Sequence, residues 1–232
     1  MTGKRVINLA TLLQVLDAPQ SKLDLQRYFA AGPRPGDAPP FTGSRFERLA
    51  GGGDRAASWD VITADDLVAV EMLNVRVPAR VALHLLEGEL GNTITRELRE
   101  IPVDAVLGTE KSAARVAVNS PASNAWHLLK NCDDVGWVTA GKLLARKRPR
   151  LIPVYDRVVR CAYGAPKGFW LWLDGMLQKR DGVLAQRLAT LREAAGLPDE
   201  ISALRVLDVT IWMRHRKRHS EDRCPGISAD LD

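Results

Sequence analysis

The residues between positions 135 and 159 have the types and the spacing that most directly suggest chemistry. Gly136 follows a short polar stretch and precedes a helical pattern, and Thr139 and Lys142 fall in the first turns of that helix. Backbone N–H groups at a helix start bind phosphate without reading sequence, and a glycine lets a ligand approach the backbone closely. The stretch therefore predicts an anion site, and the basic run 146–150 follows directly after it.

A single carboxylate follows this stretch at a suggestive position. Asp156 comes twenty residues after Gly136, near the start of the next helix and among apolar valines. A carboxylate there can point from a helix N-terminus into a cleft, where it stabilises a developing positive charge or activates water. The plainer interpretation is that Asp156 only stabilises the helix N-terminus, as aspartate commonly does.

The charge distribution agrees with a polyanionic partner. The net charge is +5, yet the whole excess lies in residues 130–180, which hold 11 basic and 4 acidic side chains, while each flank is −1. A basic patch confined to one segment is typical of nucleic-acid binding. The alternative is a solvated helix face followed by a basic loop.

Composition excludes several classes of protein. Of the 232 residues, 46% are apolar and 26% are charged, which is ordinary for a globular chain and argues against overall disorder. No apolar run approaches the length of a membrane span or of a signal peptide, so we expect a cytoplasmic protein. Three widely spaced cysteines exclude a disulfide framework and a CxxC-type zinc or iron–sulfur site. We therefore expect no metal and no cofactor.

Apolar periodicity predicts an all-α fold. Strand-like alternation of useful length is absent, and Gly and Pro divide the chain into helices. A Pro- and Gly-rich loop over 31–58 separates two N-terminal helices from the remainder. The expected organisation is N-terminal helices and loop over 1–62, a helical region over 63–215 and a basic, flexible tail over 216–232. Helices are expected at 93–99, 121–130, 137–147, 168–178, 183–195 and 202–214, with a further one opened by Pro153. Thr63 and Asp66 have the spacing of a capping box and predict another helix start there.

The periodicity breaks between two of these helices in a way that defines a hairpin. Residues 131–136 form a short polar segment ending in Gly136, so 121–147 is predicted to be helix, hairpin, helix. This stretch resembles the helix-hairpin-helix superfamily of DNA glycosylases. The resemblance rests on the hairpin glycine, on Thr139-Ala140 in the second helix and on Asp156 in a Pro-Val-x-Asp context, and it covers roughly residues 121–162.

The resemblance implies a function and its site. Asp156 would be the catalytic carboxylate of a DNA glycosylase that flips a damaged or modified base into a pocket and hydrolyses its N-glycosidic bond. The hairpin would contact duplex DNA through residues of the second helix and its start. These are Gly136, Trp137, Val138, Thr139, Lys142 and Arg146.

The chain departs from the family pattern at three positions. Asp134 replaces the first hairpin glycine and Asp133 stands where proline is usual, which weakens a phosphate-binding turn. Val138 occupies the position of the lysine that forms a Schiff base in bifunctional members, so no lyase activity is expected. A second resemblance, of the N-terminal loop and of residues 204–212, is to an uncharacterised actinomycete family that implies no chemistry.

Aromatic side chains supply candidates for stacking on an extruded base. The base pocket is assigned to Trp126, Tyr155 and Trp59. Trp137 is as well explained by core packing as by DNA contact, and Lys142 as well by a solvated helix face as by a phosphate. The run 169–173 is better explained as core, and Arg205 and Asp208 as an intrahelical ion pair.

Three hypotheses follow. The first is a monofunctional DNA glycosylase, monomeric, nucleoid-associated and bound to duplex DNA. The second is a non-catalytic helix-hairpin-helix DNA-binding protein, which the altered hairpin would suit. The third is a hydrolase that cleaves the N-glycosidic bond of a free nucleoside with the same carboxylate.

Overall fold

The computed structural model describes residues 6–32, 34, 36–219 and 226–227, and these residues form helices and loops without a β-strand. The expected all-α class is therefore confirmed for this part of the chain. Its helices are α1 (Leu9–Asp17), α2 (Pro19–Tyr28), η1 (Thr42–Arg45), η2 (Leu49–Gly51), α3 (Ala64–Glu71), α4 (Ala79–Leu86), α5 (Glu89–Arg99), α6 (Ser112–Val116), α7 (Pro121–Lys130), α8 (Trp137–Lys147), α9 (Arg157–Ala162), α10 (Phe169–Ala194) and α11 (Ala203–His215).

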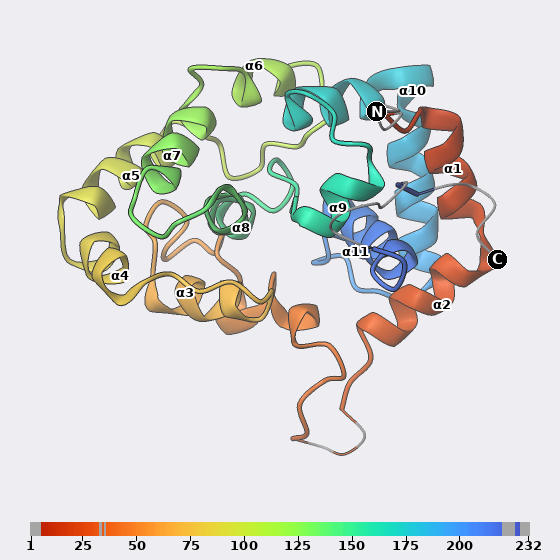
Figure 1. The fold of residues 1–232 in the computed structure, drawn as a ribbon, viewed down its shortest axis with the longest axis horizontal. Helices are drawn as coiled ribbons and strands as arrows, with labels where there is room; N and C mark the ends of the chain where they lie inside the picture. The colour runs from red at the N-terminus through yellow and green to blue at the C-terminus, as the bar shows by residue number, and fades with distance from the viewer. Residues whose placement is uncertain (1–5, 33, 35, 220–225, 228–232) are drawn as a thin grey trace.

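The two ends of the chain pack together and the middle forms the other side of the molecule. Helices α1 and α2 lie against α10 and α11, whereas α3 to α8 gather opposite them (Figure 1). One apolar cluster runs through both sides, from Leu12 on α1 to Leu143 on α8 and Ile211 on α11, each essentially inaccessible to water. Burial of such side chains is the main favourable term in folding. The two sides therefore share one core.

The predicted helix-hairpin-helix is present with the expected bounds. Helices α7 and α8 pack side by side, and residues 131–136 connect them. Asp134 adopts a left-handed conformation with φ of 59°, which glycine adopts most readily and aspartate tolerates. Asp134 therefore occupies a backbone conformation in the connection between α7 and α8 for which glycine is best suited.

Several helix boundaries differ from the sequence expectation. Helix α5 begins at Glu89 rather than at residue 93, because Gly88 precedes it as a cap. Pro153 does not open a helix: residues 153–156 lie outside any helix, and α9 begins only at Arg157. Helix α10 covers both helices expected at 168–178 and 183–195, with a break at 179–182 where the backbone is non-helical.

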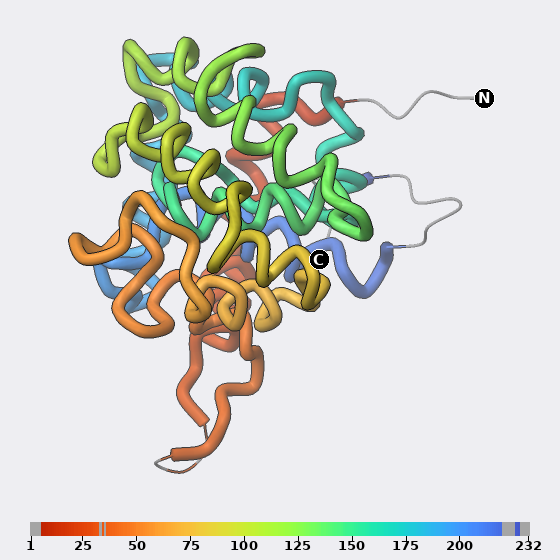
Figure 2. The backbone as a smooth tube through the Cα atoms, turned by 90° about the vertical axis from the view of Figure 1, so that its left-hand side faces the viewer, coloured from red at the N-terminus to blue at the C-terminus, as the bar shows by residue number. Residues whose placement is uncertain are grey.

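The loop between α2 and α3 first projects from the body and then returns to it (Figure 2). On its return it forms η1 and η2 and leads into α3 through the predicted capping box, in which Thr63 and Asp66 exchange hydrogen bonds. The described residues of the expected 31–58 loop thus contain two short 3₁₀ helices and no α-helix.

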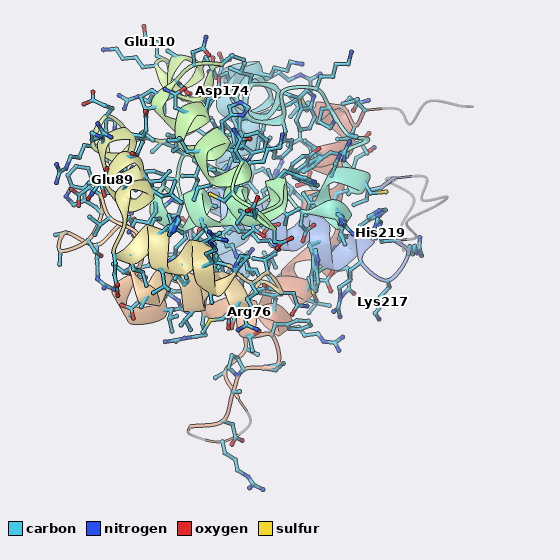
Figure 3. All side chains as sticks on the ribbon, turned by 60° about the vertical axis from the view of Figure 1, so that its left-hand side comes forward. Arg76, Glu89, Glu110, Asp174, Lys217 and His219 are labelled. Carbon is cyan, nitrogen blue, oxygen red and sulfur yellow. The ribbon has the colours of Figure 1, made fainter. Side chains whose placement is uncertain are left out.

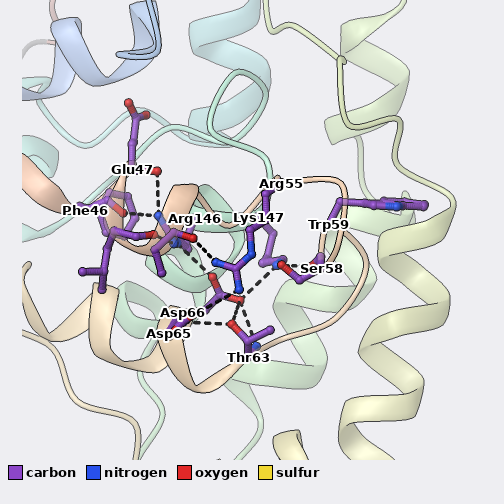
Figure 4. Close-up of polar contacts among 12 residues, drawn as sticks. Phe46, Glu47, Arg55, Ser58, Trp59, Thr63, Asp65, Asp66, Arg146 and Lys147 are labelled. Atoms are coloured by element: carbon purple, nitrogen blue, oxygen red, sulfur yellow. Dashed lines mark hydrogen bonds and ion pairs between the residues drawn. The ribbon is translucent and has the colours of Figure 1, made fainter.

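Three consecutive cations at the end of α8, Arg146, Lys147 and Arg148, hold this returning loop, and Figure 4 labels the first two. The Arg146 guanidinium donates to Asp66 at 3.0 Å and to the carbonyls of Phe46, Glu47 and Leu49 at 2.6–2.7 Å. The Lys147 ammonium donates to Asp66 at 3.1 Å.

Lys147 and Arg148 extend these contacts beyond Asp66. Lys147 also donates to the carbonyl of Ser58, and Arg148 donates to those of Trp59, Leu98 and Ile101. All three cations are buried. Arg146, Lys147 and Arg148 therefore connect α8 to the loop and to α5.

No helix in the described ranges is both long enough and apolar enough to cross a membrane. Of the expected basic tail, residues 216–219 and 226–227 are described, and the remaining positions lie outside the described residues. The guanidinium of Arg216 lies 4.8 Å from the ring centre of Trp212 and 4.9 Å from that of Phe41. The first residue of the tail is thus packed on aromatic side chains.

Candidate active site

A cavity of about 750 Å³ lies where the two sides of the molecule meet. Its walls come from the end of α2, the start of η1, the segment after α3, the starts of α8 and α9, and one face of α11. Segments as far apart in sequence as Tyr28 and Trp212 thus surround one space. A cavity of this size is typical of a small-molecule or nucleobase site.

The start of α8 forms one wall of this cavity. Gly136, Trp137, Val138 and Thr139 all line it. Gly136 is the N-cap residue and makes no side-chain cap, and a Cβ built on it would meet no atom within 4 Å. Helix N-termini carry unpaired N–H groups and a partial positive charge. The predicted anion-binding helix start therefore faces the cavity and not only the outer surface.

Asp156 lies on the same cavity, directly before α9. Its Oδ1 accepts a hydrogen bond from the backbone N–H of Val159 at 2.9 Å, so the side chain caps α9. Its Oδ2 lies 4.0 Å from the Nζ of Lys142, and 20% of the side chain is exposed. The capping and the cleft-facing interpretations of Asp156 are therefore compatible, since each uses a different oxygen.

Lys142 lies on α8, one helical turn after Val138, and its side chain also lines the cavity. Its Nζ donates to the carbonyl of Leu73 at 2.7 Å, and only 5% of its side chain is exposed. Burial lowers the pKa of this ammonium, and the nearby Asp156 opposes the shift. Lys142 is thus a cavity residue whose positive charge lies close to the carboxylate of Asp156.

A buried polar cluster on α11 forms the opposite wall. Arg205 contacts the carboxylate of Asp208 one turn later, and its other terminal nitrogen donates to the hydroxyl of Tyr28 at 2.5 Å and to the carbonyl of Gly43 at 3.0 Å. A side chain at position 43 would clash with that hydroxyl and with Leu73. The glycine therefore allows η1 to approach α2 and α11 closely.

Burial also changes the acidity of this cluster. Desolvation raises the pKa of Asp208 to about 7, although Arg205 opposes the shift, and Asp156 across the cavity adds to it. Desolvation likewise raises the pKa of Tyr28, again against Arg205. Two carboxyl groups with different environments, Asp156 half-buried and Asp208 buried, thus face one cavity, an arrangement that enzymes use to separate proton donors from acceptors.

Aromatic rings line the mouth of the cavity. Tyr28 and Phe41 are stacked with ring centres 5.1 Å apart, and Trp212 meets both rings edge-on at 6.1 Å. Trp137 lies on the wall formed by α8. These rings make this part of the cavity wall apolar, and the guanidinium groups of Arg205 and Arg216 pack against their faces.

The structure corrects two of the expected DNA contacts. Arg146 has no exposed side-chain surface, and its guanidinium nitrogens donate within the protein, so it is unavailable to a phosphate. Lys142 faces the interior of the cavity rather than an outer helix face. Gly136, Trp137, Val138 and Thr139, in contrast, are brought together at the cavity wall.

The central basic segment is accordingly less exposed than its charge suggests. Four of its eleven cations are buried: Lys142, Arg146, Lys147 and Arg148. The seven exposed ones are Lys130, Arg150, Arg157, Arg160, Lys167, Lys179 and Arg180. Of these seven, Arg157 lines the cavity.

The residues expected to form the base pocket lie apart from this cavity, and their assignment stays a prediction. Trp59 lies on the far side of α8, where the guanidinium of Arg148 sits 5.4 Å from its ring centre. Trp126 and Tyr155 line a different cavity of about 530 Å³, between α7 and the start of α10. Trp126 comes from α7, whereas Trp59 and Tyr155 come from loop segments, and the tertiary packing places none of the three on the cavity that holds Asp156.

Sequence reasoning missed part of the site. Tyr28 and Phe41 come from segments assigned to helix packing and to a loop, and Arg205 and Asp208 were interpreted only as an intrahelical pair. That ion pair is present, but it also faces the cavity. The one available signal was the presence of two charged residues in the largely apolar run 203–213, since charges on such a face require partners.

A model of a family of unknown function (DUF6308) matches residues 21–215 of the chain. All the residues that line the cavity fall within this range. No curated protein and no solved structure matches the chain.

Proposed function

The chain belongs to this family of unknown function, and from its cavity we propose that it is a monofunctional glycosylase that hydrolyses the N-glycosidic bond of a damaged or modified base in DNA. The observation that carries the proposal is that the start of α8 and Asp156 line the same cavity. The helix-hairpin-helix resemblance requires this pairing, and the two elements are twenty residues apart in sequence.

The cavity offers the groups that such a reaction needs. When the bond between the base and C1′ breaks, its electron pair leaves with the base and positive charge develops on the sugar. The free Oδ2 of Asp156 would stabilise this charge and take a proton from the water that adds to C1′. Tyr28, Phe41 and Trp212 would form the apolar wall beside which the extruded base lies.

A hydrolase that acts on a free nucleoside is the second candidate. The observation that favours it is the burial of Lys142, Arg146, Lys147 and Arg148, which leaves fewer cations for a DNA backbone than the sequence suggests. A small nucleoside needs only the cavity.

One experiment separates these proposals. The protein is incubated with duplexes that each carry one lesion and, in parallel, with free nucleosides. Abasic sites are detected by alkali cleavage, and released bases are separated by chromatography. Base release from a duplex supports the first candidate, and release from nucleosides alone supports the second. Duplex binding without release supports a non-catalytic DNA-binding protein, and neither binding nor release contradicts all three.

Adding borohydride to the same incubation with duplexes tests whether the protein has lyase activity. Val138 stands at the position of the family lysine, and the Lys142 amine is already bound to the Leu73 carbonyl. The product should therefore be an intact abasic site with no trapped adduct. An adduct mapped to Lys142 would contradict the monofunctional assignment and leave the glycosylase assignment standing.

A further inference from the structure

The structure brings together two histidines and a cysteine that do not line the cavity already described. The possible ligand atoms of Cys161, His215 and His219 all lie within 4.8 Å of one another. Cys161 is near the end of α9, His215 is the last residue of α11, and His219 lies just beyond it (Figure 3). These three residues thus form a cluster that no short sequence motif predicts.

The local backbone explains why the two histidines face each other. After α11 the chain makes a turn in which the N–H of Arg218 donates to the carbonyl of His215 at 3.0 Å. This turn folds His219 back toward His215, and the centres of the two imidazole rings lie 5.7 Å apart. Farther along, the N–H of Ile227 donates to the carbonyl of Ala162 at 3.2 Å. The chain therefore returns to the end of α9, next to Cys161.

The burial of these side chains is unusual for polar groups. Cys161 is 6% exposed and His215 is 2% exposed. The Nδ1 atom of His219 is inaccessible to water and has no hydrogen-bond partner within the described part of the chain. A buried nitrogen without a partner is costly, and a bound cation would remove that cost.

We propose that Cys161, His215 and His219 bind one zinc ion. Thiolate and imidazole are the ligands that zinc prefers, in tetrahedral sites with Zn–S of about 2.3 Å and Zn–N of about 2.0 Å. Ligand atoms in such a site lie about 3.3–3.6 Å apart, so atoms now within 4.8 Å of one another need to approach by about 1 Å. The fourth position is left for water or another ligand.

The ion has a structural role in this arrangement. It joins the ends of α9 and α11, and the same two helices carry Asp156 and Asp208 to the cavity. Metal binding that requires the folded arrangement of ligands adds to the stability of the fold. Zinc therefore secures two walls of the cavity without taking part in its chemistry, and this inference does not depend on the proposed function.

Metal content and a cobalt spectrum test the site. The full chain is prepared without a polyhistidine tag, reduced with a phosphine, stripped with a chelator and titrated with Zn²⁺ or Co²⁺. We expect one ion per chain, a near-ultraviolet thiolate-to-cobalt band and the intense visible bands of tetrahedral cobalt. The chelator should lower the melting temperature by several degrees, and Zn²⁺ should restore it.

Two variants and two matched controls make the assignment specific. Cys161→Ser should abolish the thiolate band, and His219→Ala should lower the affinity at least tenfold. Because His219 is only half-buried, its variant should remain folded by circular dichroism even if the cysteine variant does not. Cys132→Ser and His84→Ala, at residues outside the cluster, should bind like the parent chain. A stripped chain that binds no stoichiometric ion, or a spectrum unchanged in His219→Ala, would overturn the proposal.

Discussion

The Nζ of Lys142 lies 4.0 Å from the Oδ2 of Asp156, and both side chains line one cavity although they come from different helices. The lysine is anchored to the Leu73 carbonyl and the aspartate to the N–H of Val159. Each group therefore has a fixed position, and the oxygen of Asp156 nearer the lysine is the one that does not cap α9.

Replacing Asp156 with Asn tests whether this carboxylate is catalytic. Asn caps helices about as well as Asp, so α9 and the fold should be retained. The negative charge is lost, and removal of one such electrostatic group typically lowers the rate by about 10²–10³. Base release is measured under single-turnover conditions, with Asp133→Asn as the exposed control. Full activity in Asp156→Asn would remove Asp156 from the mechanism.

The salt dependence of duplex binding tests which cations contact DNA. Arg157 is exposed at the cavity, so Arg157→Ala should reduce the slope of log K against log salt by about 1. Lys142 is buried, so Lys142→Ala should leave the slope unchanged. Arg180→Ala, exposed but not on the cavity, is the matched control. A slope that falls with Lys142→Ala and not with Arg157→Ala would reverse this assignment.

Arg146→Met separates structural from DNA-binding roles for the basic run. The change leaves Asp66 without one of its two cations and three loop carbonyls without a donor. Breaking a buried ion pair in this way costs about 3–5 kcal/mol. Urea unfolding should show this loss, whereas Arg150→Met, at an exposed position, should change stability little. A variant of unchanged stability and weakened DNA binding would restore the original expectation.

The stability of the chain should depend on pH through Asp208. Its pKa is raised from 3.8 to about 7 in the folded state by burial, against the effect of Arg205 and Lys142 and with the effect of Asp156. Between these values the folded chain holds a proton that the unfolded chain has released. This carboxyl therefore lowers the free energy of unfolding progressively as pH rises through that window, and no further above it.

Asp208→Asn should remove this dependence. Urea unfolding of both chains at pH 5 and pH 8 gives the comparison, and the parent should lose more stability over this interval than the variant. Asp134→Asn, at an exposed position, serves as the control. Equal losses in the parent and in Asp208→Asn would show that Asp208 does not titrate in this range.

The sequence by itself determined the local structure. Apolar periodicity, the Thr63 capping box and the break at 131–136 depend on residues within one or two helical turns of each other, so the helical class and the α7–α8 hairpin could be predicted. The helix start at Gly136 and the placement of Asp156 just before α9 are local features of the same kind.

Only the tertiary structure decided which side chains face the cavity. The sequence does not show whether a lysine or an arginine is solvated or buried. Arg146 is buried and Arg150 is exposed, because Asp66 and the loop carbonyls lie beside Arg146. Trp126 and Tyr155 face another cavity for the same reason, and Tyr28 reaches the site because α2 packs on α11. The Cys161–His215–His219 cluster likewise arises because α9 lies against α11. Such contacts join residues distant in sequence, and their partners are set by the packing of the whole core rather than by any short pattern.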